Sequence, residues 1–121
     1  MRSTAIVIVS YAAPELLREC LIRAIQHGSA VVNRFFVIDN LSEQSGDVRA
    51  LVDEFPGVDF VFNDANVGFA SAVNLAAESL ECDMILLNPD AMLVADLDDF
   101  VKFARAEAGA SCVGALCRRL Q

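Results

Sequence analysis

Apolar residues in this chain form short strand-like runs that alternate with segments of helical spacing. Residues 5–9 form a continuous β-branched run, which is typical of a parallel strand buried on both faces. The second run ends at Asp39-Asn40. Together the runs predict five strands, over residues 5–9, 35–38, 58–62, 84–87 and 112–116.

The segments between and after these runs carry apolar residues at helical spacing. The first predicted helix begins at Pro14, which suits a first helical turn, and stops at Gly28. Further helices are predicted over residues 48–55, from residue 68 to residue 80, and after Asp96, which is expected to cap its helix. This alternation predicts an α/β fold with a doubly wound, mostly parallel, Rossmann-like sheet in the order βαβαβαβαβ.

Length and composition narrow the class of protein. The 121 residues are enough for one domain, expected to span residues 1–121, and a mean hydropathy of +0.46 excludes a disordered chain. No apolar run reaches the roughly 18 residues that cross a bilayer, so a cytoplasmic protein is expected. The net charge of −8 disfavours nucleic acid as a partner, but an anionic small ligand remains open if a divalent cation bridges it to carboxylates.

The cysteines and the single histidine do not form a zinc site of the usual spacing. None of the four cysteines stands in a CxxC pair, and they are expected to be reduced and mostly buried. His27 is expected to complement the dipole at a helix end, and the acidic residues near Asp96 to do so at a helix start.

Functional residues are expected at the carboxyl ends of the strands, where doubly wound sheets bind ligands. Four segments meet that edge: Ser10-Tyr11, Asp39-Asn40, residues 63–68 and Asn88-Pro89-Asp90. No glycine-rich loop follows the first strand, so neither the dinucleotide fingerprint nor a phosphate-binding P-loop is present.

Each candidate has two readings on the residues alone. Asp39 can accept hydrogen bonds from a ribose or a base, or it can be a turn aspartate that bonds its own backbone. Asp90, held by Pro89, can bind Mg²⁺ or Mn²⁺ and so screen a diphosphate, or it can belong to a simple strand-stop turn. Residues 66–74 start a helix at Gly68 that either binds an anion or packs closely on the sheet, capped by Asn66 or Ser71.

The ordered set of these segments resembles the family 2 glycosyltransferases of the GT-A fold, particularly their rhamnosyltransferase-like branch. The resemblance rests on four segments spread over nearly the whole chain, residues 6–11, 37–42, 66–74 and 86–90. It implies an inverting sugar transferase, of which this chain is the part that binds the nucleoside-diphosphate sugar.

The resemblance also implies residue roles. Ser10 and Tyr11 would line the nucleoside pocket, and Asp39 would bind the base or the ribose. The segment from Asn66 to Gly68 would lie beside the nucleotide-sugar. Asp90 would match the last acid of the metal-binding DxD motif, with Asn88 in place of its first acid, so a divalent cation (Mg²⁺ or Mn²⁺) is the implied cofactor.

Two departures from the family pattern qualify these expectations. Ala12 stands where the family usually has asparagine, and such enzymes usually run to more than twice this length. The chain is therefore expected to end before the half that carries the acceptor site and the general base, and no base is assigned. An uncovered edge or face is expected to make the chain self-associate.

Two other classes stay open. One is a non-catalytic nucleotide-binding module. The other is a receiver-like or flavodoxin-like domain, although a receiver would need paired acids where Ser10-Tyr11 stands and a lysine after a late strand, whereas Lys102 falls in a predicted helix.

Overall fold

The computed structural model describes residues 3–107 and 109. Strands and helices alternate along this part of the chain, as predicted. They are β1 (Thr4–Ser10), α1 (Pro14–Gly28), β2 (Arg34–Asp39), α2 (Ser45–Arg49), β3 (Val58–Phe62), α3 (Phe69–Ser79), β4 (Asp83–Leu87) and α4 (Asp98–Ala106). The predicted strand at residues 112–116 lies outside the described residues.

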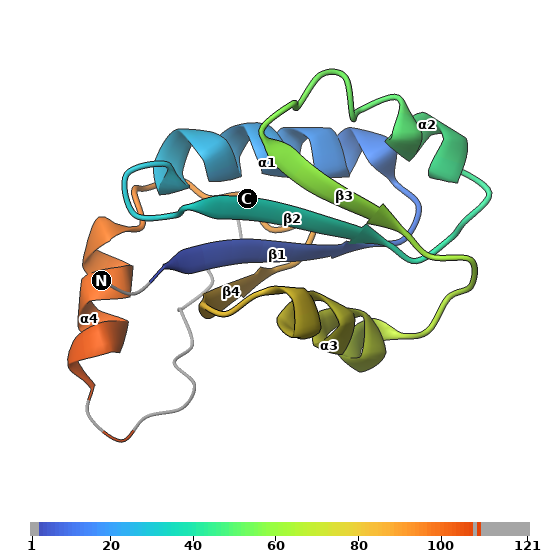
Figure 1. Cartoon of the computed structure of the whole chain (residues 1–121). Helices are drawn as coiled ribbons and strands as arrows, with labels where there is room; N and C mark the ends of the chain where they lie inside the picture. Colours follow the sequence, from blue (N-terminus) through green and yellow to red (C-terminus); the bar gives the residue numbers. More distant parts are fainter. Residues whose placement is uncertain (1–2, 108, 110–121) are drawn as a thin grey trace.

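The four strands form one parallel sheet in the order β3-β2-β1-β4 (Figure 1). The chain builds outward from β1 to β2 and β3, then crosses back to place β4 on the other side of β1. The strand order therefore reverses between β1 and β4, and their carboxyl ends mark the point where doubly wound sheets bind ligands. Helices α1 and α2 cover one face of the sheet and α3 covers the other, which confirms the predicted α/β, Rossmann-like class.

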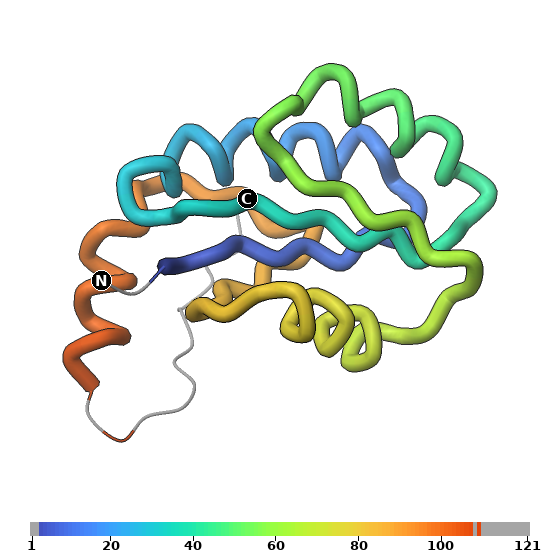
Figure 2. Tube along the Cα trace, in the orientation of Figure 1, coloured from blue at the N-terminus to red at the C-terminus, as the bar shows by residue number. Residues whose placement is uncertain are grey.

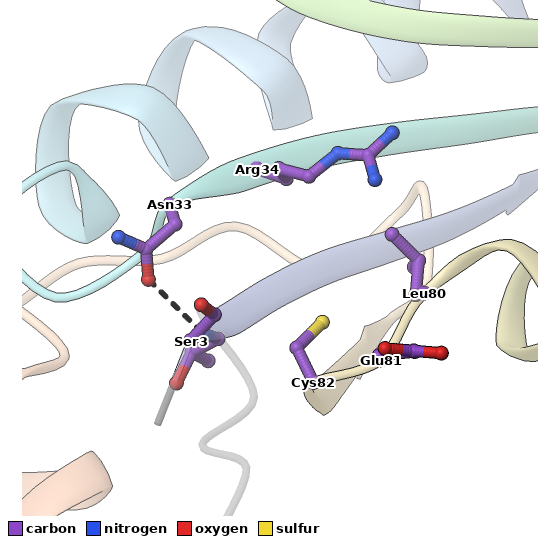
Figure 3. Close-up of a pocket in the computed structure, with 7 residues that line it drawn as sticks. Ser3, Asn33, Arg34, Leu80, Glu81 and Cys82 are labelled. Atoms are coloured by element: carbon purple, nitrogen blue, oxygen red, sulfur yellow. Dashed lines mark hydrogen bonds between the residues drawn. The ribbon is translucent and has the colours of Figure 1, made fainter. Parts of the chain in front are cut away.

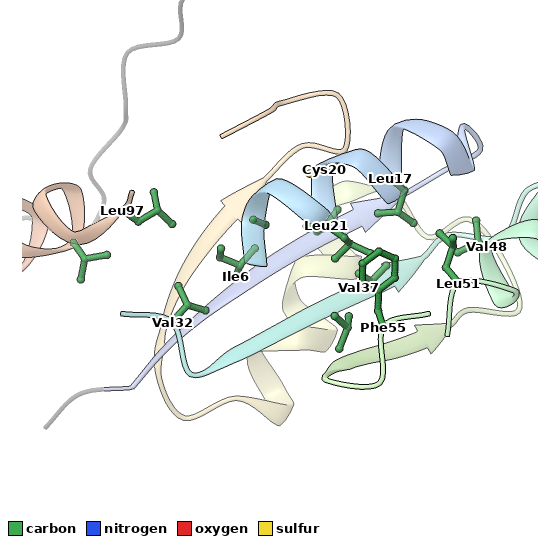
Figure 4. Packing of buried hydrophobic residues seen from close by; sticks show 14 residues of the cluster. Ile6, Leu17, Cys20, Leu21, Val32, Val37, Val48, Leu51, Phe55 and Leu97 are labelled. Carbon is green, nitrogen blue, oxygen red and sulfur yellow. The ribbon is translucent and has the colours of Figure 1, made fainter. Parts of the chain in front are cut away.

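Alternation along the strands gives each face its own core. Ile6 and Ile8 of β1 pack with Val37 of β2 against the buried side of α1, together with Val48 of α2 (Figure 4). Intervening residues of the same strands face α3, where the small side chains of Ala72 and Ala76 let the helix lie close to the sheet. Both faces of β1 are thus buried, as its continuous apolar run predicts.

The second helix is shorter than predicted. Three of its expected apolar positions, Val48, Leu51 and Phe55, are buried, but regular helix ends at Arg49 and Val52 is exposed. Beyond Arg49 the backbone continues in tight turns, with the amide of Leu51 bonded to the carbonyl of Val48. Phe55 precedes proline, a position that disfavours helical backbone, so the segment buries its apolar residues without completing a helix.

Asp96 does not cap a helix, contrary to the prediction. Helix α4 begins at Asp98 after Leu97, with no side-chain cap, and Asp96 Oδ1 lies 3.0 Å from Nδ1 of His27 at the end of α1. The amide of Leu97 also bonds the carbonyl of His27 at 3.0 Å. Residues 91–97 thus return from the carboxyl edge of the sheet to the amino edge, where α4 lies (Figure 2).

Gly28 is the last residue of α1, but it does not stop the helix in the way predicted. It remains helical, with Ser29 after it in right-handed conformation, so no left-handed cap stops the helix. A methyl group at Gly28 would lie 3.3 Å from side-chain atoms of Ile6 and Val32. The glycine is therefore needed for close packing of α1 on β1.

Two further expectations can be compared with the described residues. Cys20 is buried and Cys82 half-buried, and both are free thiols, whereas Cys112 and Cys117 lie outside the description. No helix in residues 3–107 is both long and apolar enough to cross a bilayer.

Candidate functional site

Ser10 and Asp39 form a buried polar pair at the carboxyl edge of the sheet. They end β1 and β2 and are direct partners in the parallel register. Their exposed fractions are 0% and 1%, although both side chains are polar. Buried polar atoms are nearly always hydrogen-bonded, so their partners indicate what the pair does.

Each residue of this pair keeps one oxygen without a partner. Asp39 Oδ2 accepts a 2.5 Å hydrogen bond from the hydroxyl of Ser45, the first residue of α2. Within the described part of the chain, Asp39 Oδ1 and Ser10 Oγ have no partner. An unpaired buried polar group costs about 1–3 kcal/mol, so two neighbouring ones point to a missing partner. Asp39 bonds a distant side chain rather than its own backbone, unlike an ordinary turn aspartate.

A hollow of about 300 Å³ lies at the same edge of the sheet, at the strand-order reversal between β1 and β4. Ser10 and Asp39 are not among the residues that line it. Its walls come from the segment after β1 and from the turn after β4. Three predicted site residues line it, Tyr11, Asn88 and Asp90. The remaining lining residues are Val9, Ala12, Ala13, Leu16 and Pro89. The structure thus groups residues from both sides of the switch point around one open space.

The turn after β4 is attached to α1. The carbonyl oxygen of Asn88 accepts a hydrogen bond from the amide of Ala91 at 2.9 Å, and the Cys20 thiol lies 3.6 Å from the same oxygen. Burial, and then the nearby negative charge of Asp90, raise the pKa of Cys20 to about 11. The thiol is therefore protonated at neutral pH and can donate to Asn88, which fixes the turn against the helix.

Among the described residues that line this hollow, Asp90 is the only acidic one, and it is exposed. Among residues 3–107 and 109, no group of three or more histidine, cysteine or acidic side chains could hold a metal ion. The one carboxylate would leave most coordination positions to phosphate oxygens and water, as Mg²⁺ in nucleotide sites commonly accepts.

Asn66 and Gly68 lie apart from the hollow, in the loop between β3 and α3. Gly68 precedes α3 with φ of +84°, a conformation that favours glycine, and its amide bonds Asn66 Oδ1 at 3.0 Å. Neither Asn66 nor Ser71 caps α3, which has no side-chain cap. The two predicted residues therefore shape this loop and do not line the hollow.

Asn40 organises the same loop, although no role was predicted for it from the sequence. Its Nδ2 donates to the carbonyl of Gly68, and its Oδ1 accepts from Asn63 Nδ2 and the amide of Val67. Because side chains alternate along a strand, Asn40 serves the α3 side whereas Asp39 serves the α2 side. Strand alternation could have predicted from the sequence that Asn40 faces the side opposite to Asp39. Its hydrogen-bond partners, however, are brought close only by the fold.

The segment between β1 and α1 has unusual backbone geometry. Ala12 and Ala13 both have positive φ, 59° and 52°, which costs a non-glycine residue about 1–2 kcal/mol each. The amide of Ala13 donates to Oε1 of Gln44 at 3.0 Å, which ties this segment to the loop after β2. Strained backbone of this kind persists where surrounding contacts hold it, and here it borders the hollow.

A second, smaller hollow of about 170 Å³ lies at the amino edge of the sheet (Figure 3). Its lining includes Asn33, Arg34 and Cys82, and Asn33 Oδ1 is already bonded to the amide of Thr4. The buried oxygens without partners all lie at the other edge of the described structure. The carboxyl-edge hollow is therefore the better candidate for a ligand site.

Solved structures with a similar fold were found by comparison with known proteins. No family model and no curated protein matches the sequence. Among solved structures, Staphylococcus aureus TarS, residues 1–349, matches with a TM-score of 0.71 and 13% identity over 93% of this chain and 38% of that one. A second structure of S. aureus TarS matches with a TM-score of 0.66 and 14% identity over 85% of this chain and 19% of the other.

A crystal structure of GalNAc-T7 with UDP, GalNAc and Mn²⁺ also matches, with a TM-score of 0.62 and 17% identity over 73% of this chain and 18% of that chain. These neighbours are glycosyltransferases. The chain has a GT-A-like glycosyltransferase fold, and it spans well under half the length of each of these neighbours.

Proposed function

We propose that this chain is the part of an inverting glycosyltransferase that binds the nucleoside-diphosphate sugar. The observation that carries the proposal is the buried pair of Ser10 and Asp39, whose free oxygens lie at the carboxyl ends of β1 and β2, the same edge of the sheet as the hollow. The GT-A-like fold supports it, because Ser10 ends β1, one of the two strands between which the strand order reverses, and Asp39 ends the adjacent β2.

The nucleoside is proposed to supply the missing hydrogen bonds. A base N–H or a ribose hydroxyl can donate to Asp39 Oδ1, and the Ser10 hydroxyl can donate to a carbonyl or ribose oxygen. Tyr11 is exposed and lines the hollow, so its ring is available to a base. Asn66 and Gly68 are proposed to act on the nucleotide-sugar indirectly, by shaping the loop between β3 and α3 that Asn40 holds.

The diphosphate is proposed to bind through a divalent cation at Asp90. A chain of net charge −8 repels a diphosphate, and a bound Mg²⁺ or Mn²⁺ reverses that repulsion locally. Asp90 would hold the ion and Asn88 would offer a neutral oxygen beside it. The cation would stabilise the charge of the leaving diphosphate.

In the complete reaction, an acceptor hydroxyl forms the new glycosidic bond as the bond between the anomeric carbon and the diphosphate oxygen breaks. The hydroxyl proton passes to a general base, and the nucleoside diphosphate leaves with the bonding electron pair. No residue of the described chain is assigned as that base. The proposed role of this chain is to bind and orient the donor.

Isothermal calorimetry with UDP, GDP, ADP and dTDP in Mn²⁺ tests the proposal. We expect one of the four to bind, and Asp39→Ala to weaken that binding at least tenfold, because the free acceptor is lost. Asp53→Ala removes an exposed carboxylate away from the site and is the matched control. A folded protein that binds none of the four would contradict the proposal.

The same samples distinguish donor binding from turnover. The isolated chain is expected to bind the nucleotide without transferring sugar from the corresponding nucleotide-sugar to added acceptor sugars. Measured transfer would show that this chain contains its own general base and would refute the reading of the chain as a non-catalytic module.

A further inference from the structure

We propose that Ser45 is a positioning residue of the donor site, which fixes Asp39 so that a single carboxylate oxygen is offered to the ligand. This inference rests on the proposed function. It adds a residue that lies outside the segments carrying the family resemblance, and it specifies how Asp39 recognises its ligand.

The Ser45 hydroxyl is held on both sides. It donates its one proton to Asp39 Oδ2 at 2.5 Å and accepts from the amide of Ser42 at 2.9 Å. The side chain is buried, with 8% of the residue exposed. Because a hydroxyl has a single proton, Ser45 has no donor left for a ligand and acts only through Asp39.

The contact settles which oxygen of Asp39 is free. A carboxylate can turn about its terminal torsion and present either oxygen, or both. The bond to Ser45 occupies Oδ2, and Oδ1 is the atom without a partner. Ser10, the register partner of Asp39 in the adjacent strand, also has a hydroxyl without a partner. Asp39 therefore offers Oδ1 to the ligand, and the Ser10 hydroxyl is the second free group at this edge.

This arrangement predicts that Ser45 and Asp39 act as one unit in binding. Loss of the Ser45 hydroxyl frees the carboxylate to turn and leaves its second buried oxygen unpaired. Ser45→Ala should raise the dissociation constant for the nucleoside diphosphate by about tenfold. Ser45→Thr keeps the hydroxyl and should bind within about threefold of the unmodified chain.

The experiment is a double-mutant cycle on the full chain, measured by calorimetry with the tightest-binding diphosphate of UDP, GDP, ADP and dTDP in Mn²⁺. In the Asp39→Ala background, adding Ser45→Ala should change the dissociation constant by less than twofold, because Ser45 has nothing left to position. Ser42→Ala removes a nearby hydroxyl that accepts from the amide of Gln44 and does not contact Asp39, so it is the matched control.

The outcomes separate this inference from the proposed function. If Asp39→Ala weakens binding but Ser45→Ala binds like the unmodified chain, the positioning role is overturned and the donor site stands. Equal losses from Ser45→Ala with and without Asp39 would also overturn it, because they show a structural effect. If the unmodified chain binds no diphosphate, the proposed function fails first. Thermal unfolding of each variant verifies folding, and Ser45→Gly, which also removes the hydroxyl, takes the place of Ser45→Ala if that variant does not fold.

Discussion

Asn40 Nδ2 donates to the carbonyl oxygen of Gly68 at 3.0 Å, which joins the end of β2 to the start of α3. The preceding residue, Asp39, makes its side-chain contact on the opposite face, with Ser45 of α2. Two adjacent residues thus connect one strand end to elements on both sides of the sheet. The loops at the carboxyl edge of the sheet are therefore linked to one another by side-chain hydrogen bonds. Sequence motifs alone do not show which side chains form these bonds.

Replacing Asn40 should loosen the loop between β3 and α3. Asn40→Ala removes three hydrogen bonds, to Gly68, Val67 and Asn63, and should lower the free energy of unfolding by about 2–3 kcal/mol. Urea denaturation measures the loss, and hydrogen exchange at the amide of Val67 locates it. Asn63→Ala removes only one of these side-chain bonds and is the control. A loss no larger than that of the control would contradict the assigned role of Asn40.

The backbone before α1 provides a substitution that should stabilise the chain. Ala13 has positive φ and is also the N-cap residue of α1, two settings in which glycine is better than alanine. Ala13→Gly should raise the free energy of unfolding by about 0.5–1 kcal/mol. Ala70→Gly, in the first turn of α3, should have the opposite sign. Matching signs in urea denaturation would show that the backbone at Ala13 is not strained.

Much of the fold follows from local patterns. Four strands and α1 lie within one or two residues of their predicted positions, because buried parallel strands require continuous apolar runs and α1 carries a clear helical stripe. The apolar spacing gave a wrong prediction for the second helix, where the backbone turns after Arg49. Val48, Leu51 and Phe55 have the spacing of a helix, yet they are buried by a short helix followed by tight turns.

The candidate site was predictable only in part. The rule that ligands bind at the carboxyl edge led to five residues. The structure places Tyr11, Asn88 and Asp90 around one hollow at the strand-order reversal, and Ser10 and Asp39 at the ends of β1 and β2. Asn66 and Gly68 lie in the loop before α3 and do not line this hollow. Ser45 was missed because its role depends on a contact between separate elements, and neither its residue type nor its spacing signals that contact.

Close packing at the end of α1 makes Gly28 sensitive to any larger side chain. Side-chain atoms of Ile6 and Val32 would lie 3.3 Å from an added β-carbon, so Gly28→Val should cost about 1–3 kcal/mol of unfolding free energy. Gly57→Val is the control, because no atom lies within 4 Å of a β-carbon there. Chemical denaturation compares the two variants. Equal effects would mean that the space around Gly28 can relax.

The side of β4 that faces α3 is expected to support self-association of the chain. In the described structure β4 pairs only with β1, and Leu86 on this face is 48% exposed because α3 lies over β1 and β2. Sedimentation velocity at rising concentration should show reversible association, and Leu86→Lys should weaken it. Val94→Lys, at an exposed apolar residue outside the sheet, should not. A monomeric profile at every concentration would refute this expectation.

The Cys20 thiol should make the chain less stable in alkaline solution. Its ordinary pKa is 9.0, and burial together with the charge of Asp90 raises the pKa to about 11 in the folded chain. Below pH 9 the thiol is protonated in both states and its stabilising contribution is complete. Between pH 9 and 11 only the unfolded chain releases the proton, so stability falls as pH rises.

Urea denaturation at pH 8 and pH 10.5 measures this effect. The unmodified chain should lose more stability over this interval than Cys20→Ala, which has no thiol to titrate at this position. Asp90→Asn should lower the Cys20 pKa, since a negative charge near the thiolate is removed, while burial keeps it above 9.0. Identical losses in the unmodified chain and Cys20→Ala would show that burial and the charge of Asp90 do not raise the pKa of Cys20.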